Sequence, residues 1–368
     1  MVNKVVILVP CLSIGGAEKQ ISLLAPKLHQ DGFHITVISM IPPDAFQDLL
    51  ASAGIELLTL NMKKGVYSLS SFFQLVSLLK KINPQQLVTF NFPANITGRA
   101  IKLFIPKIKL ITSIRSSTFG SAKRSYLMKI SRVLDKYTVP NSFIVAHSFL
   151  ENGVIDEKRL RVIQNAVTID QTADALADDI ANIRTTVLKR PEDFLWVAVG
   201  RHELPKDYPS LLNACSMLIE AGVTNWHLVV VGSGDLTPML IEMIKTLNLT
   251  EYVTFVGRKK LVLPYYYASN AYVSSSAWEG MPNALVEAMM AGLPVLSTSV
   301  GEVPNILEDG YSGFKVEPKN PEALFSMMKK MTLMDVSELS RLGKNAHTFA
   351  MDNFNIGTIV SKWKEILN

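Results

Sequence analysis

The chain has 368 residues, of which 48% are hydrophobic and 19% are charged, so it can bury large cores and is not globally disordered. Its formal net charge of +5 favours anionic partners, although an ordinary basic protein has the same balance. The two cysteines, Cys11 and Cys215, form neither a disulfide framework nor a metal-binding spacing, which suits a reducing compartment.

The first half of the chain alternates short apolar runs with helical patterns. The run VVILVP at 5–10 predicts a buried strand, and Ile21, Leu24 and Leu28 recur behind it at helical spacing. HITVISM at 34–40 predicts the next strand. The start is therefore interpreted as a strand–helix–strand unit and not as a cleaved signal peptide.

Further along, a helix with one apolar side is predicted from residues at helical spacing, namely Leu69, Phe72, Phe73, Val76 and Leu79. The runs LVTF and LITSI predict two more strands, and RLRVIQNAV is expected to close a first domain. Residues 168–193 lack strand character, so they are interpreted as a linker and a helix that enters a second domain.

The second half repeats this architecture in five strands, each followed by a helix: FLWVAVG, HLVVVGSG, YVTFVG, AYVSSS and PVLST. Strands that alternate with helices predict a parallel sheet covered on both faces. The fold class is therefore α/β, with two tandem domains over residues 1–167 and 168–353 and a cleft between them. The final helix, 354–368, carries an apolar stripe and is expected to pack back on the first domain.

Ligands in such sheets bind beyond the carboxyl ends of the strands, so polar residues there are site candidates. Arg201 and Lys206 follow an apolar strand in GRHELPKDYP and suit a diphosphate, the arginine by its fork and the lysine as a point charge. The alternative is an ordinary solvated loop. Gly16 lets backbone approach a ligand at a helix start, but a plain tight turn explains it at least as well.

Two glutamates flank a Gly-Met-Pro-Asn turn in SSSAWEGMPNALVEAMMAGLPVLST at 274–298. Glu279 precedes the turn, and Glu287 lies in a helix that begins near Ala284. Amides of such a turn donate to phosphates or sugar hydroxyls, and carboxylates accept from hydroxyls. For Glu279 the alternative is an acidic residue matched to the helix dipole. Glu287 stands among apolar residues and is expected to be buried with a polar partner.

Four motifs occur in the order GRHELPKDYP, VVVGSGD, VTFVG and SSAWEGMPNALVEAMMAGLPVLSTSVGEVP. Together with GGAEKQISLLAPKLHQDGFHITV near the start, they resemble the retaining enzymes of glycosyltransferase family 4. The resemblance covers nearly the whole chain, and the block 275–304 is its most specific part. It implies the GT-B fold, in which two Rossmann-like domains with parallel sheets face a central cleft. It further implies transfer of a sugar from a nucleotide sugar, expected to be a UDP-sugar, with retention and without a metal or other cofactor. Consistent with this, the chain has no D-x-D motif.

The resemblance also implies roles for the site residues. Arg201 and Lys206 would bind the donor diphosphate and stabilise its charge as it leaves. Glu279 would face the transferred sugar, and Glu287 would contact the donor ribose. The other donor-binding residues are expected to be Gly16 under the diphosphate, Gly257 in a loop that holds the base, and the turn residues Met281, Pro282, Asn283 and Ala284. Arg115 stands where many members carry a histidine, and it either meets an acceptor phosphate or pairs locally.

The stretch SAKRSYLMKISRVLDKYTV at 121–139 predicts a basic amphipathic helix suited to an anionic membrane surface. The alternative is a surface helix whose apolar side lies in the core. Relatives that resemble this chain often extend lipid-linked or surface glycans in bacteria, which implies a polyprenyl-diphosphate-linked saccharide or a surface polysaccharide as acceptor. The expected location is cytoplasmic, peripheral on the inner face of the bacterial cytoplasmic membrane, since no apolar stretch is long enough to span a bilayer.

Two other functions stay open at this point. One is a non-catalytic protein of the same fold that binds a nucleotide sugar, and the other is a UDP-sugar 2-epimerase, against which the glutamate pair and its turn argue. Nucleic acid is not an expected partner, because the basic residues are spread over the first domain without a recognised binding motif.

Overall fold

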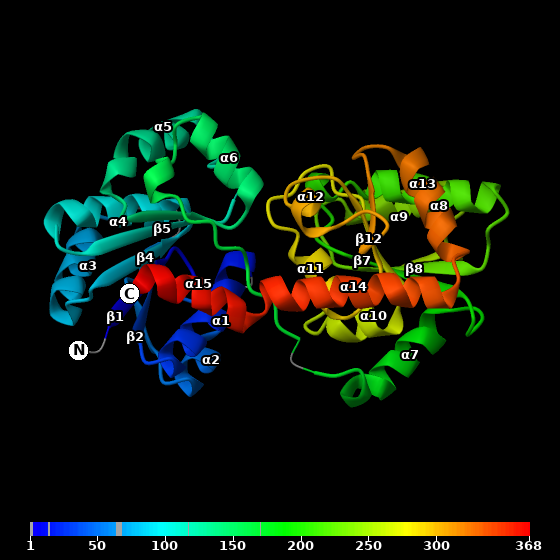
Figure 1. The fold of residues 1–368 in the computed structure, drawn as a ribbon, viewed down its shortest axis with the longest axis horizontal. Coiled ribbons are helices and arrows are strands. Elements are labelled where there is room, and N and C mark those ends of the chain that lie inside the picture. The colour runs from blue at the N-terminus through cyan, green and yellow to red at the C-terminus, as the bar shows by residue number, and fades with distance from the viewer. Residues whose placement is uncertain (1–2, 14, 64–67, 117, 170) are drawn as a thin grey trace. The chain divides into compact units, whose positions relative to one another are not determined.

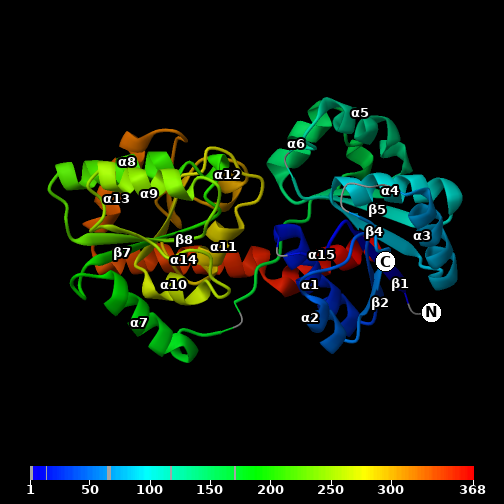
Figure 2. The ribbon, with the colours of Figure 1, turned by 180° about the vertical axis from the view of Figure 1, so that it is seen from behind.

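The computed structural model describes the chain over residues 3–13, 15–63, 68–116, 118–169 and 171–368 (Figures 1 and 2). The chain divides into two compact units. Residues Met1–Ala166 and Ile356–Asn368 form the N-terminal unit, and Val167–Asn355 form the C-terminal unit. The sequence placed these boundaries after residues 167 and 353, within two residues of the division in the structure.

The N-terminal unit is built on a six-stranded parallel sheet in the order β3-β2-β1-β4-β5-β6. Its strands are β1 (Lys4–Val9), β2 (His34–Ser39), β3 (Glu56–Thr59), β4 (Gln86–Phe90), β5 (Lys109–Ile114) and β6 (Tyr137–Pro140). Side chains alternate between the two faces, so Val5 and Ile7 enter one buried cluster and Val6 and Leu8 enter another. Apolar residues on both faces of β1 fit a parallel sheet that is covered on both sides.

The helices of this unit are α1 (Gly16–Gln30), α2 (Gln47–Ser52), α3 (Leu69–Ile82), α4 (Asn91–Phe104), α5 (Ala122–Ser131), α6 (Phe143–Glu151) and α15 (Ile356–Leu367). The cluster on one face includes residues of α1, α2 and α15, and the cluster on the other includes residues of α3 and α4. Helix α15 lies beside α1 in Figure 1 and buries Ile359, Val360 and Trp363 in this unit. The carbonyl of Leu367 accepts hydrogen bonds from the side-chain amides of Asn3 and Gln86.

Helix α3 is oriented differently from the sequence prediction. Leu69 and Phe73 were expected on its buried side, but they are 79% and 55% exposed. Leu75, Val76 and Leu79 are the residues that it buries. The apolar stripe of the sequence is wider than the surface that the helix covers. Phe73 therefore packs edge-to-face against neighbouring rings at the surface instead of entering the core.

A buried ion pair fastens α5 to the sheet. The guanidinium of Arg99, on α4, donates to both carboxylate oxygens of Asp135 at 2.9 and 2.5 Å, and both side chains are almost fully buried. Arg99 also donates to the Met128 carbonyl near the end of α5. Asp135 accepts from Thr112 on β5 and Thr138 on β6. Every oxygen of this buried carboxylate is thus hydrogen-bonded, as a charge away from water requires.

The C-terminal unit has a second six-stranded parallel sheet, in the order β12-β11-β10-β7-β8-β9. Its strands are β7 (Phe194–Val199), β8 (Trp226–Val231), β9 (Val253–Phe255), β10 (Ala271–Ser274), β11 (Val295–Thr298) and β12 (Gly313–Val316). Five of the six were predicted, whereas β12 was not. Val197 on the central strand β7 is paired with Val229 on β8 and Tyr272 on β10.

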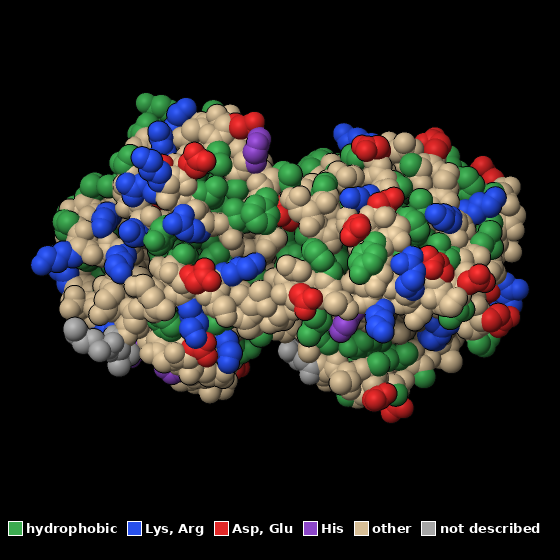
Figure 3. Space-filling view, viewed as in Figure 1, with side chains coloured by type: hydrophobic (Ala, Val, Ile, Leu, Met, Phe, Trp, Pro, Cys, Tyr) green, Lys and Arg blue, Asp and Glu red, His purple; other side chains and the backbone are tan. Residues whose placement is uncertain are grey.

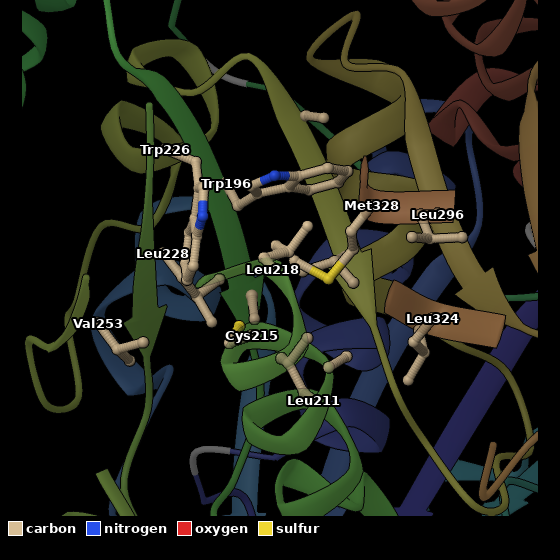
Figure 4. Close-up of a cluster of buried hydrophobic side chains, with 14 of the residues drawn as sticks. Trp196, Leu211, Cys215, Leu218, Trp226, Leu228, Val253, Leu296, Leu324 and Met328 are labelled. Atoms are coloured by element: carbon tan, nitrogen blue, oxygen red, sulfur yellow. The ribbon is translucent and has the colours of Figure 1, made fainter. Parts of the chain in front are cut away.

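The helices of this unit are α7 (Ala177–Val187), α8 (Tyr208–Glu220), α9 (Thr237–Thr246), α10 (Leu263–Ala268), α11 (Asn283–Met290), α12 (Val303–Ile306), α13 (Pro321–Thr332) and α14 (Val336–Phe354). Helices α8, α9 and α13 cover one face of the sheet, and α7, α10, α11 and α14 cover the other (Figure 2). Figure 4 shows the first face, where Trp196, Trp226, Cys215 and Met328 lie together. No helix among the described residues has the length and apolar character that a bilayer crossing requires.

Candidate active site

The candidate site of the C-terminal unit lies at the carboxyl edge of its sheet, where the loops after β7, β8, β9 and β10 begin. This edge is where ligands bind in open parallel sheets. The loop after β7 leads through the 3-10 turn η4 (Leu204–Lys206) to α8, and it carries both predicted cations. The guanidinium of Arg201 is exposed and lies 2.8 Å from the carboxylate of Glu203. It is thus a solvent-facing fork near the end of the central strand.

Lys206 and Glu279 form an ion pair that the sequence did not predict. The Lys206 ammonium lies 2.5 Å from Glu279 Oε1, and the two side chains are 25% and 15% exposed. The hydroxyl of Ser276 donates to the same carboxylate oxygen at 2.8 Å. The structure therefore brings together two of the predicted catalytic residues, 73 positions apart in the chain.

Hydrogen bonds to backbone carbonyls hold the two loops that carry this pair against each other. The hydroxyl of Ser275 donates to the Lys206 carbonyl, and the amide of Ala277 donates to the Pro205 carbonyl. Asp207 follows with a φ of 44°, in the left-handed region that glycine adopts most readily. Its carboxylate accepts from the hydroxyl of Ser210 on α8 at 2.7 Å. Asp207 thus occupies a position suited to glycine, where a short polar side chain is also tolerated.

The glycines after β8 allow close packing of backbone. A Cβ atom on Gly234 would lie 2.5 Å from the His202 carbonyl oxygen, and one on Gly232 would meet the Gly200 carbonyl. Gly232 also donates its amide to the carbonyl of Gly257, whose φ is 70°. Close contacts with the loop after β7 therefore explain why Gly232 and Gly234 carry no side chain. Gly257 lies in the loop after β9 and is hydrogen-bonded to the loop after β8.

His202 is a buried histidine between the two predicted cations. It is fully buried, and its Nδ1 lies 2.8 Å from the hydroxyl of Thr237 at the start of α9. Its ring packs against Tyr208 and Phe255. Burial lowers the pKa of His202, so the neutral imidazole is favoured. We infer from these contacts that it fixes the path of the loop after β7.

The turn before α11 presents a small set of amides. Pro282 has no N–H, and the amide of Asn283 donates back to the Met281 carbonyl at 3.0 Å. Within the part of the chain that the structure describes, the amides of Met281 and Ala284 donate to no protein group. Of the four turn residues that were expected to contact the donor, only Met281 and Ala284 therefore have a backbone N–H available to a ligand. Pro282 itself accepts from Leu285 and Val286 at the helix start.

Gly301 fixes the position of this turn. It has a φ of 52°, and a Cβ atom there would lie 2.5 Å from the Glu279 carbonyl oxygen and 2.8 Å from that of Gly280. The amide of Glu302 donates to Gly280 at 3.1 Å, and the Glu302 side chain is fully buried. Neither Gly301 nor Glu302 was predicted as a site residue from the sequence, because both lie beyond α11 and β11 in the chain, away from the turn that they contact.

Glu287 lies on α11 and is half-buried. The hydroxyl of Tyr266 donates to its carboxylate at 3.2 Å and also reaches the Ala284 carbonyl. Burial, followed by the charge of Glu287, raises the pKa of Tyr266 well above its usual value. Tyr266 therefore remains a hydrogen-bond donor to Glu287. The predicted polar partner is present, although the residue is half-buried and not fully buried.

Gly16 belongs to the N-terminal unit, where it is the exposed first residue of α1. The Glu18 carboxylate folds back over Gly15, in the space that a side chain on residue 15 would occupy. Burial raises the pKa of Glu18. No cluster of three or more metal-ligating side chains occurs among the residues described in either unit.

Two family models match successive halves of the chain. The description "Glycosyltransferase Family 4" matches residues 14–171, and "Glycosyl transferases group 1" matches residues 179–349. The chain is a glycosyltransferase of the family 4 type. The match to the second description covers every candidate residue of the C-terminal unit, from Arg201 to Glu287.

Similar proteins agree with this assignment. The glycosyltransferase is 24% identical over 310 residues to the UDP-Gal:alpha-D-GlcNAc-diphosphoundecaprenol alpha-1,3-galactosyltransferase of Escherichia coli, covering 82% of this chain and 79% of the relative. It is 23% identical to the amylovoran biosynthesis glycosyltransferase AmsD of Erwinia amylovora, over 99% of both chains. The structure of Anabaena Alr3699/HepE in complex with UDP matches 99% of each chain at 20% identity, with a TM-score of 0.82. The fold is GT-B.

Proposed function

We propose that this glycosyltransferase moves a sugar from a UDP-sugar, with retention and without a metal, to a membrane-associated glycan acceptor. The acceptor class is a polyprenyl-diphosphate-linked saccharide or a surface polysaccharide. The observation that carries the proposal is the Lys206–Glu279 pair at the carboxyl edge of the sheet, beside the amides of Met281 and Ala284. It combines one cation, one carboxylate and two N–H donors in adjacent loops of one unit.

Each group has a chemical task in such a transfer. Departure of a nucleoside diphosphate builds negative charge on its phosphates, and fixed cations lower that barrier. Lys206 provides a point charge, and Arg201 provides an exposed fork that can fold over a diphosphate. Glu279 accepts from hydroxyls of the transferred sugar, and Glu287, held by Tyr266, accepts from the donor ribose.

The proposed donor nucleotide and the roles of Gly16 and Gly257 rest on similarity. The Anabaena protein was solved with UDP and also with UDP-glucose, and the named donor of the Escherichia coli relative is UDP-Gal. We place Gly257 beside the nucleotide base because it lies at the beginning of the loop after β9, where its carbonyl accepts from the amide of Gly232 after β8. Gly16 offers the first amides of α1 to a phosphate.

The proposed membrane contact is the surface of α5. Of the residues on this helix, Met128 is buried, whereas Tyr126, Leu127 and Ile130 are exposed. Basic residues lie among them, and Figure 3 shows lysine and arginine side chains gathered with hydrophobic ones over α4 and α5. Exposed apolar side chains within a basic surface match an anionic bilayer, and they argue against a helix that turns its apolar side to the core. The proposed location is therefore the inner face of the cytoplasmic membrane.

Calorimetric titration of UDP, GDP and ADP, each with EDTA and with magnesium, tests the donor site. We expect UDP to bind in both conditions. Lys206→Met should weaken binding by about 10- to 150-fold, because a hydrogen bond to a charged group is worth roughly 1.5–3 kcal/mol. Lys245→Met is the matched control, since it removes a lysine that also pairs with a carboxylate, on the surface of α9. Absence of nucleotide binding in the wild type would refute the donor assignment.

Transfer is then assayed with the UDP-sugar that binds and an undecaprenyl-diphosphate-linked saccharide. The coupling constant of the anomeric proton in the product reports retention, and an inverted product would contradict that part of the proposal. Co-sedimentation with vesicles containing phosphatidylglycerol tests the membrane contact. Lys123→Glu with Lys129→Glu should release the protein, whereas Lys245→Glu with Lys319→Glu should not. Unchanged sedimentation of the first variant would remove α5 as the contact.

A further inference from the structure

Arg115 is the first residue after β5, at the carboxyl edge of the sheet in the N-terminal unit. Its Nε donates to the hydroxyl of Ser113 at 2.7 Å, and its Nη1 donates to Asn165 Oδ1 at 2.8 Å. The guanidinium lies over the rings of Phe90 and Trp363, at 5.1 and 5.8 Å from their centroids. Neutral acceptors and two aromatic rings therefore hold this cation in one place.

Arg115 forms no ion pair with a carboxylate among the residues that the structure describes. No acidic side chain in the described part of the chain lies within 4.0 Å of its nitrogens, and its buried Nη2 atom has no hydrogen-bond partner there. Arg99, in the same unit, shows the usual arrangement, since its guanidinium is paired with Asp135 through two bonds. Burial lowers the pKa of Arg115 to about 9, so the guanidinium is still charged at neutral pH. An unsatisfied buried donor with a full charge is costly unless a ligand completes it.

A pocket of about 350 Å³ adjoins Arg115. A second guanidinium, that of Arg124 on α5, lines it and lies 5.1 Å from the Phe92 ring, which also lines it. Phe119 adds an aromatic wall, and Thr118 adds a hydroxyl. None of the described lining residues is acidic. The pocket thus combines two positive charges with apolar walls.

We propose that Arg115 and Arg124 bind the phosphate groups of an isoprenoid-diphosphate acceptor, whose first isoprene units lie against Phe92 and Phe119. This inference rests on the proposed function and names the acceptor subsite for it. The oxygens of a diphosphate match the N–H groups of two forked guanidiniums. One of these oxygens would accept the hydrogen bond that Arg115 Nη2 does not make within the protein. The aromatic walls select a phosphate that carries an apolar chain over a free phosphate.

Calorimetric titration of the UDP-saturated protein with farnesyl diphosphate and with inorganic pyrophosphate tests the inference. Saturating UDP fills the donor site, so that the probes do not bind at Lys206. We expect farnesyl diphosphate to bind at least tenfold more tightly than pyrophosphate. Arg115→Met and Arg124→Met should each weaken its binding tenfold or more while changing UDP binding less than twofold. Arg161→Met is the matched control, because Arg161 is an exposed arginine of the same unit that also lies over a ring.

Each result has one meaning. Wild-type affinity in Arg115→Met and Arg124→Met, or no binding of farnesyl diphosphate, would overturn the inference. Equal affinity for pyrophosphate would overturn the isoprenoid assignment. Failure of UDP to bind would count against the proposed function alone, since the farnesyl titration is then repeated without UDP. If Arg115→Met does not fold, Arg115→Lys keeps the charge without the fork and should still weaken binding, and Arg124→Met tests the exposed arginine.

Discussion

Replacing Glu279 by glutamine separates donor binding from sugar transfer. In the structure the Lys206 ammonium lies 2.5 Å from Glu279 Oε1. A donor diphosphate that binds Lys206 must compete with this carboxylate for the same ammonium. Glutamine keeps an acceptor for the hydroxyl of Ser276 but removes the charge. Glu279→Gln should therefore bind UDP more tightly than the wild type while transferring sugar more slowly.

The magnitude follows from the geometry of the pair. At 2.5 Å and an effective dielectric constant of about 20, the Coulomb attraction is roughly 6.6 kcal/mol. Lys206 and Glu279 are 25% and 15% exposed, so hydration lost by both groups offsets most of this attraction. A net coupling of about 1 kcal/mol, in the range of measured accessible pairs, corresponds to roughly fivefold tighter UDP binding.

The assay is calorimetry with UDP at low and high salt, together with turnover of the UDP-sugar. The gain in affinity should shrink in high salt, because screening weakens the competing pair. Glu242→Gln, which breaks the exposed pair with Lys245 on α9, should leave both UDP affinity and turnover unchanged. Weaker UDP binding by Glu279→Gln would refute the competition and show that Glu279 holds Lys206 in place for the diphosphate.

Three further predictions concern stability and the turn. Asp135→Ala leaves the buried Arg99 charge uncompensated, so the free energy of unfolding should fall by about 3–5 kcal/mol and Tm by roughly 6–20 °C. The double variant Arg99→Met with Asp135→Leu removes both charges, and a larger loss of stability in that variant than in Asp135→Ala would contradict this prediction. Burial lowers the pKa of His227 to about 4. Between pH 6.5 and 4 the unfolded chain therefore binds a proton at this histidine that the folded chain does not bind, so the free energy of unfolding falls as the pH falls. The expected loss is about 2 kcal/mol from pH 7 to pH 5. Urea unfolding of His227→Gln should lack that part of the loss. Gly301→Ala meets the Glu279 carbonyl at a φ of 52° and should cost about 1–2 kcal/mol and weaken UDP binding, as calorimetry would detect.

Much of the fold follows from local patterns that the sequence displays. Most of the strands were predicted from short apolar runs between helical stretches, and recognising such runs needs only short-range information. Two strands were missed. Strand β6 (Tyr137–Pro140) overlaps the end of the stretch 121–139, which was predicted to be helical although α5 ends at Ser131. Strand β12 has four residues, Gly313–Val316, and its apolar character is interrupted by Lys315. Leu69 and Phe73 were misplaced because periodicity shows which residues share a helix side, but not how much of that side its neighbours cover.

The site was predictable in its residue types and not in its pairings. The positions of Lys206 and Glu279 after strands β7 and β10 follow from the order of the strands. Their direct contact depends on loop bonds such as the one from Ser275 to the Lys206 carbonyl, which no local pattern reveals. The same holds for Arg115, whose surroundings combine β4, β5 and the far helix α15. Non-local contacts set the electrostatics of both sites.

Helix α15 has a consequence for how the protein is made. Its residues Ile359, Val360 and Trp363 belong to the core of the N-terminal unit, although the ribosome makes them only after the whole C-terminal unit. Domains usually fold in the order of their synthesis. Here the first unit emerges with the apolar surface of α1 and β4 that α15 covers, and this surface stays open until residues 356–367 have been made. The core of the N-terminal unit is therefore complete only when α15 is present. Loss of residues 356–367 would expose that core to solvent although it is built mainly from the first half of the chain.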